Sequence, residues 1–247
     1  MTEQEKRRFD ALCATEAGVM PEEGRIGTYG EKRLHRMLKH WCCPDTDCHE
    51  QAVGRFVADI LRDGQIIEIQ TGSLYPLAAK LAYYLEETEY SVTVVHPLIA
   101  ECDLLRLDRD SGELLRKRRS GKHEGAGQLL AALSPISRFL DSPRLTVYAP
   151  LLRTEEHRYS ERVRYRRSGA VEKEVFVREL LGDIRLCGTE SYRPFLPEAS
   201  EFVAAEFEKQ SGLKGREAGR VLLTLCGAGV LTRRREGRRY RYFSVET

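Results

Sequence analysis

The chain has 247 residues, of which 41% are hydrophobic and 32% are charged, and its formal net charge is +2 at pH 7. These values exclude a disordered chain and a chain that is basic throughout, and they indicate a globular protein of one or two domains. The chain begins MTEQEKRRFD and holds no long apolar run, so we expect no signal peptide, no membrane partner and a cytoplasmic location.

The N-terminal part predicts a polar extension and then an amphipathic helix. Residues 1–25 are polar and predict a helix followed by a loop. Thr28 and Glu31 have the spacing of a capping box, in which both side chains satisfy backbone amides at a helix start. Apolar residues then recur at helical spacing as far as Trp41.

The next stretch predicts a hairpin, a helix and a buried strand. Residues 51–61 and 65–71 predict two strands joined at Asp63-Gly64, a dipeptide typical of a tight turn. Residues 74–87 carry leucines at helical spacing, and residues 90–96 form an apolar run without a polar face. A helix between two strands of one sheet implies a right-handed crossover.

A second hairpin, a helix and a strand complete the predicted α/β domain. The hairpin spans residues 103–119 and turns at Asp110-Ser111-Gly112. Its outgoing strand carries the basic run Arg116–Arg119, a pattern typical of phosphate contacts and of a solvated strand edge. We expect a helix near residues 125–140 and a strand at 144–152.

The tail predicts two helices and a basic hairpin, the element order of a winged helix-turn-helix. The helices span residues 198–210 and 214–228, and the strands span 230–235 and 238–245. From Ser211 onward, the chain has nine Lys or Arg residues and three acidic residues. The predicted segments are an extension (1–25), an α/β domain (26–152), a charged appendage and connector (153–192) and a winged-helix domain (193–247).

The first hairpin places two acids opposite each other. If Asp63 and Gly64 are the central residues of a two-residue turn, Asp59 pairs with Glu68, and Gln70 shares their face. Like charges opposite each other destabilise a strand pair, so this arrangement indicates a cation between them. Mg²⁺ is typically held by one or two carboxylates, and it activates water. The alternative interpretation is a pair of solvated acids on an exposed face.

These residues and their element order resemble the PD-(D/E)XK superfamily, the restriction-endonuclease-like nucleases, over about residues 28–100. The resemblance implies an α/β fold with a mixed sheet flanked by helices, a Mg²⁺ or Mn²⁺ cofactor, and hydrolysis of DNA phosphodiesters. It implies that Asp59, Glu68 and the Ile69 carbonyl bind metal. It also implies that Glu31 is an outer metal or water-orienting group, although the capping box alone explains this residue.

Gln70 departs from the motif, because it stands where lysine usually does. A neutral amide cannot supply the lysine charge or act as a base at neutral pH. Some members of the superfamily, including competence proteins resembling CoiA, have an E-x-Q version, so the change does not exclude activity. Arg55 and Lys80 are candidates to supply the missing charge, and an inactive fold that only binds DNA remains open.

The tail resembles winged-helix DNA-binding domains, and this resemblance implies DNA contacts from the second helix and the hairpin. Winged helices also mediate protein contacts, which leaves open an interaction protein whose tail binds a protein partner. The predicted DNA-binding residues are Lys214, Arg216 and Arg220 on the helix, and Arg233, Arg234, Arg235, Arg238, Arg239 and Arg241 on the hairpin.

Seven cysteines are scattered along the chain, which favours reduced thiols. Cys42, Cys43, Cys48 and His49 lie close in sequence, but their spacing matches no standard zinc pair, and zinc binding remains open. No phosphate-binding or dinucleotide-binding glycine pattern is present, so we expect no nucleotide cofactor.

The sequence therefore predicts a metal-dependent deoxyribonuclease whose tail holds the DNA, with Asp59, Glu68, Gln70 and Glu31 at its site. The alternative from another class is a non-catalytic DNA-binding or regulatory protein built on an inactive nuclease fold. The superfamily resemblance is compatible with a homodimer, since cutting both strands commonly requires two subunits. A duplex, a junction and a single strand all remain open as substrates.

Overall fold

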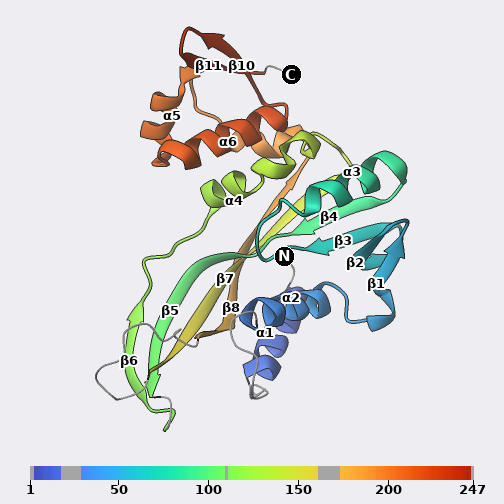
Figure 1. Ribbon diagram of the computed structural model, residues 1–247, viewed down its shortest axis with the longest axis vertical. Coiled ribbons are helices and arrows are strands. Elements are labelled where there is room, and N and C mark those ends of the chain that lie inside the picture. The colour runs from blue at the N-terminus through green and yellow to red at the C-terminus, as the bar shows by residue number, and fades with distance from the viewer. Residues whose placement is uncertain (1–2, 18–28, 109–110, 161–172, 246–247) are drawn as a thin grey trace. The chain divides into compact units, whose positions relative to one another are not determined.

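The computed structural model describes residues 3–17, 29–108, 111–160 and 173–245 (Figure 1). The protein is a mixed α/β protein with a main mixed sheet flanked by helices and a small C-terminal antiparallel sheet with helices. The main sheet has the strand order β1-β2-β3-β4-β7-β5-β6, and β8 also pairs with β7. No helix within the described ranges is both long and apolar enough to span a membrane.

The chain forms two compact units, each assembled from separate stretches. Unit 1 comprises residues 1–49, 97–124 and 150–183, and unit 2 comprises residues 50–96, 125–149 and 184–247. The predicted segments were continuous in sequence, and their boundaries remain a prediction.

Unit 2 contains the predicted hairpin and its crossover helix, which lies beside β3 and β4 in Figure 1. The hairpin strands are antiparallel, whereas β3, β4 and β7 run parallel to one another. The strands are β1 (His49–Val53), β2 (Phe56–Arg62), β3 (Gln65–Ile69), β4 (Ser91–Val95) and the first part of β7 (Leu145–Ser160). The helices are α3 (Leu77–Glu87), α4 (Ala126–Ala132) and the 3₁₀ helix η2 (Ser134–Phe139).

The β2–β3 hairpin confirms the predicted turn. Asp63 and Gly64 have φ angles of 50° and 77°, as a type I′ turn requires at its two central residues. The strands pair in the predicted register as far as Ile60 and Ile67. The prediction of one strand over residues 51–61 is wrong, because Gly54, with φ of 58°, makes a turn that separates β1 from β2.

Unit 1 combines two N-terminal helices with the other strands of the main sheet. Phe9 of the first helix packs edge-on against Trp41 of the second, with ring centroids 5.0 Å apart. β5 pairs antiparallel with β6 and parallel with β7. The elements are α1 (Glu3–Ala17), α2 (Tyr29–Cys42), the 3₁₀ helix η1 (Thr46–Cys48), β5 (Leu98–Asp108), β6 (Leu114–Arg119), the rest of β7 and most of β8 (Lys173–Cys187).

Much of the stretch interpreted as a charged connector is regular strand. Residues 153–160 continue β7, and β8 pairs with β7. Arg153 on β7 bonds Glu179 on β8 with an N–O distance of 2.6 Å. The charged side chains that obscured the strand pattern therefore contact one another across the sheet.

The C-terminal part of unit 2 forms two helices and a three-stranded antiparallel sheet in the order β10-β11-β9. Val221, Leu222 and Leu225 of the second helix are buried. The helix predicted over residues 198–210 begins later, because Phe202 lies in a strand and stacks on Tyr242 with ring centroids 5.7 Å apart. The elements are the 3₁₀ helix η3 (Thr189–Phe195), β9 (Glu201–Val203), α5 (Ala204–Ser211), α6 (Gly215–Gly227), β10 (Leu231–Glu236) and β11 (Arg239–Ser244).

Helix α6 also packs tightly against α4 and η2. The Thr224 hydroxyl donates to the Leu130 carbonyl at 2.6 Å. At Gly227 the helix comes so close to η2 that a Cβ atom would lie 2.4 Å from the Ser137 carbonyl oxygen. A larger residue at this position must displace the helix, because the nearest opposing atoms, the Ser137 carbonyl oxygen and carbon, belong to the backbone.

We expect Gly227→Ala to destabilise the protein by about 2–3 kcal/mol, since an added methyl group must push α6 away from η2. Gly219→Ala is the matched control on the same helix, because its Cβ would meet nothing within 4 Å. That change should stabilise by about 0.5–1 kcal/mol through helix propensity. Urea unfolding of both variants measures the difference, and equal stabilities would contradict the described packing.

Candidate active site

Glu68 is the centre of a buried polar cluster between β3 and α3. This residue is only 4% exposed. Lys80 Nζ lies 2.9 Å and 2.8 Å from the two carboxylate oxygens, and the Tyr84 hydroxyl donates to Oε1 at 3.1 Å. Lys80 also donates to the Val57 carbonyl of β2 at 2.7 Å. The ammonium group therefore links the helix to both strands of the hairpin.

Asp59 lies beside this cluster on β2 and is half-buried. Its Oδ2 atom accepts a hydrogen bond from the Ile69 backbone amide at 2.8 Å. The recorded backbone pairing ends one residue earlier, at Ile60 and Ile67. The Asp59 side chain therefore bonds the backbone of the neighbouring strand, and the cross-strand pairing of Asp59 with Glu68 remains a prediction. The two acids still interact, because the charge of Asp59 raises the pKa of Glu68.

Gln70 directs its side-chain amide into the loop before α3. Its Nε2 atom donates to the Ser73 carbonyl at 2.7 Å. Its backbone amide donates to Val95 at 2.9 Å, and its carbonyl lies 2.7 Å from His96 Nδ1, which donates to it. These bonds fix the end of β3 relative to β4. A water-orienting role for Gln70 remains a prediction.

The sequence-predicted residues are only partly brought together. Lys80, one of the two candidates for the missing charge, contacts Glu68, whereas the Arg55 guanidinium stacks on Phe56 at 5.2 Å from the ring centroid. Glu31 lies in α2, but its side chain falls outside the described residues, and so does the capping box, so its role remains a prediction. The Ile69 carbonyl as a metal ligand also remains a prediction.

Tyr84 and His96 are site residues that the sequence interpretation missed. Tyr84 follows Lys80 by four residues, so both side chains lie on one face of α3. That spacing is a usable signal once Lys80 is suspected. His96 directly follows β4 in sequence, and no local pattern marks it.

The pKa of the Glu68 carboxyl is raised above its ordinary value, chiefly by burial. The bond and charge of Lys80 oppose this rise, and the charge of Asp59 adds to it. Lys80 therefore favours the ionised form of this carboxyl, whereas burial favours the protonated form.

This shift gives a testable pH dependence of stability in the absence of divalent cations. Between the ordinary pKa of 4.5 and the raised native value, the folded protein binds more protons than the unfolded chain. The Glu68 contribution to the free energy of unfolding is therefore full below pH 4.5 and falls as pH rises through the native pKa. Denaturant titrations over this range should show a flatter profile for Glu68→Gln, and parallel profiles would contradict the shift.

The donor chemistry fits a hard divalent cation. A Mg²⁺ ion usually takes one or two carboxylate ligands from a protein, and waters and substrate phosphate supply its other ligands. Asp59 and Glu68 provide two such carboxylates. Within the described part of the chain, no group of three or more His, Cys, Asp or Glu side chains is arranged to hold a metal. Around the cysteine cluster, His49 Nε2 instead lies 2.8 Å from the Cys43 carbonyl oxygen.

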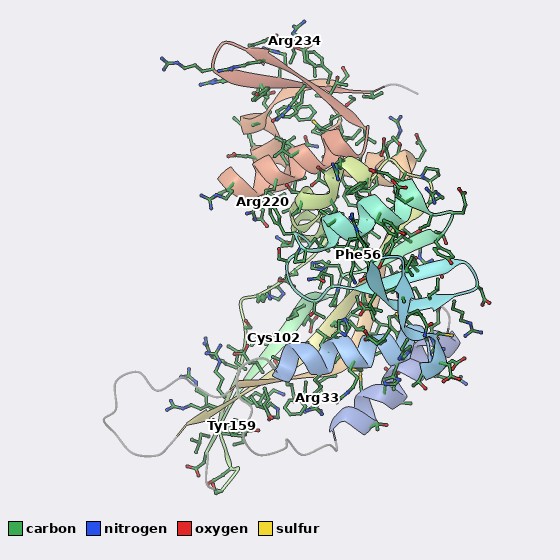
Figure 2. All side chains as sticks on the ribbon, turned by 45° about the vertical axis from the view of Figure 1, so that its right-hand side comes forward. Arg33, Phe56, Cys102, Tyr159, Arg220 and Arg234 are labelled. Atoms are coloured by element: carbon green, nitrogen blue, oxygen red, sulfur yellow. The ribbon has the colours of Figure 1, made fainter. Side chains whose placement is uncertain are left out.

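The predicted DNA-binding side chains of the tail are mostly exposed. Lys214, Arg216 and Arg220 are exposed at the start and along one side of α6, and Figure 2 shows Arg220 and Arg234 at the surface. Arg241 differs, because it bonds Glu201 at 2.6 Å and joins β11 to β9. The other exposed arginines are Arg233, Arg234, Arg235, Arg238 and Arg239 on the β10–β11 hairpin.

Residues 32–186 match a protein family described as Domain of unknown function (DUF8091), and this match covers more than half of the chain. The chain therefore belongs to this family. It is also 26% identical over 191 residues to an uncharacterized protein of Treponema pallidum (strain Nichols). The matched residues make up 76% of this chain and 74% of that protein. No solved structure matches the chain. The family match contains Asp59, Glu68 and Lys80 and ends before α5.

Proposed function

We propose that this protein is a metal-dependent deoxyribonuclease of the PD-(D/E)XK type, with a C-terminal winged helix that binds DNA. The order of an acidic hairpin, a crossover helix and parallel strands β4 and β7 supports the nuclease fold. The β9-α5-α6-β10-β11 segment with its exposed arginines supports the winged helix.

The observation that carries this proposal is the position of Lys80. Its ammonium group lies within 2.9 Å of both Glu68 oxygens, and its side chain is 27% exposed. Gln70 stands at the motif position of lysine and offers no charge. Lys80 supplies that charge from α3, at the carboxylate that the motif assigns to metal binding.

Each residue then has a defined task. Asp59 and Glu68 would hold the cation, and the Ile69 amide fixes the orientation of the Asp59 carboxylate. A bound Mg²⁺ would supply an activated water and stabilise charge on the phosphodiester. Lys80 favours the ionised form of Glu68 and would offer a positive charge to the phosphodiester in the transition state. Tyr84 holds one Glu68 oxygen in place.

A divalent-metal titration against plasmid and single-stranded DNA tests the proposal. We expect nicking with Mg²⁺ or Mn²⁺ and none with a chelator. Absence of cleavage with every divalent metal, for protein that is folded and binds DNA, would contradict a nuclease.

A second candidate is a non-catalytic DNA-binding protein built on the same fold. The burial of the cluster favours this candidate, because Glu68 is 4% exposed and both of its carboxylate oxygens already bond Lys80. In that case the ion pair is purely structural. This candidate predicts salt-sensitive DNA binding that needs no metal and is never followed by cleavage.

A further inference from the structure

One face of the sheet in unit 1 carries arginines in register on three neighbouring strands. Arg106 of β5 is the cross-strand partner of Arg116 on β6 and of Arg158 on β7. All three residues are exposed. Adjacent strands lie about 4.8 Å apart, so three positive charges stand side by side across the sheet. Arg118, two residues from Arg116 on β6, lies on the same face and is exposed.

The opposite face of the same strands is neutralised by ion pairs. Lys117 lies 3.1 Å from Asp103 and 3.4 Å from Glu155. Arg153 bonds Glu101 at 2.9 Å, and Arg119 lies 3.8 Å from the same carboxylate. Basic and acidic side chains thus alternate across this face. Its charge is balanced within the protein.

The arginine face is only partly neutralised. Arg106 makes an interaction of its own within the protein. Arg158 pairs with Glu156 at 2.5 Å. For Arg116 and Arg118 no ion pair is recorded within the described ranges of the chain. Figure 2 shows many nitrogen-tipped side chains on the strands that carry the labelled Cys102 and Tyr159. Like charges placed directly opposite each other destabilise a strand pair, and Arg106 stands directly opposite Arg116.

We propose that Arg106, Arg116, Arg118 and Arg158 bind the phosphate backbone of a nucleic acid strand. A row that crosses three strands fits a linear polyanion better than a single phosphate, since successive phosphates meet successive guanidinium groups. Guanidinium groups also bond phosphate oxygens in pairs. The choice of a nucleic acid among polyanions rests on the proposed function, and an acidic polypeptide is the alternative outcome of the test.

Binding of fluorescent duplex and single-stranded oligonucleotides to the full chain, in chelator and over a range of salt concentrations, tests this surface. We expect Arg106→Gln/Arg116→Gln to weaken binding about tenfold at low salt. The slope of log K against log salt should fall by about two, since each phosphate contact contributes about 0.9 on duplex DNA. Arg118→Gln alone should lower the slope by about one.

Arg7→Gln/Arg62→Gln is the control with the same net charge. Both of its arginines are exposed and pair with nearby acids, Glu3 and Asp63. It should leave affinity and slope unchanged. An equal loss in this control, or unchanged binding of both nucleic acids by the Arg106 variants, would overturn the proposal. The proposal would also be overturned if binding of polyglutamate depended on these arginines and binding of oligonucleotides did not.

This outcome is separable from the proposed function. Chelator removes any need for cleavage, so an inactive protein leaves the measurement valid. Arg233→Gln/Arg238→Gln probes the winged helix in parallel. If that variant binds DNA normally and the Arg106 variants do not, the arginine row is a nucleic acid-binding surface and the winged helix is not.

Discussion

Glu68→Gln should abolish metal-dependent cleavage of plasmid DNA, with a loss of about a hundredfold or more. The substitution keeps the shape of the side chain and one acceptor oxygen for Lys80 and Tyr84. It removes the negative charge that would hold the cation. Nicking rates at saturating Mn²⁺ measure the effect, and metal titrations show whether additional cation restores activity. DNA binding in chelator should remain at the wild-type level.

Glu87→Gln provides the control with the same change of charge, because this residue is the last of α3 and is exposed. It should cleave at the wild-type rate. Asp59→Asn should lose as much activity as Glu68→Gln, since both carboxylates are assigned to one cation. Full cleavage by both variants would remove the site from consideration, whereas loss in only one would show that the acids do not act together.

The parts of the fold that local chemistry specifies were predictable from the sequence. Asp63-Gly64 forms the turn expected of that dipeptide. The two positive φ angles of this turn depend on the turn residues themselves and not on distant contacts. The leucines at 77, 81 and 85 are buried along α3, as their helical spacing predicts, although the helix predicted from residue 74 begins at Leu77. Local preference and tertiary packing agree at these positions, and only such positions can be assigned from one sequence.

The remaining features depend on contacts between distant residues. The Lys80–Glu68 pair joins a helix to a strand twelve positions away, and only the packing of α3 on the sheet selects Lys80 over Arg55. Phe202 enters a strand because Tyr242 is its partner, although its own neighbours favour a helix. The alternative interpretation of Glu68 as a solvated acid on an exposed face is likewise wrong, since Glu68 is buried and bonded by Tyr84 of α3. In each case a tertiary contact overrides a local pattern.

Replacing Lys80 with methionine should have two effects of opposite sign on the metal reaction. The ammonium group bonds the same oxygens that a cation needs, so its removal should tighten Mg²⁺ or Mn²⁺ binding, as calorimetry can measure. Cleavage at saturating metal should nevertheless fall about a hundredfold, because the charge beside the phosphate is lost. Lys80→Arg keeps the charge and should recover part of the activity.

The same variant distinguishes catalysis from stability. Without Lys80, the buried Glu68 loses its counter-charge, and we expect a loss of about 1–3 kcal/mol in the metal-free protein, less than for a fully buried pair because Lys80 is 27% exposed. Saturating metal should restore much of that stability, since a cation replaces the ammonium group. Lys209→Met, at an exposed position on α5, should change none of these quantities. If Lys80→Met lowered stability while cleavage continued at the wild-type rate, Lys80 would be a structural residue and the charge missing at Gln70 would have to come from elsewhere.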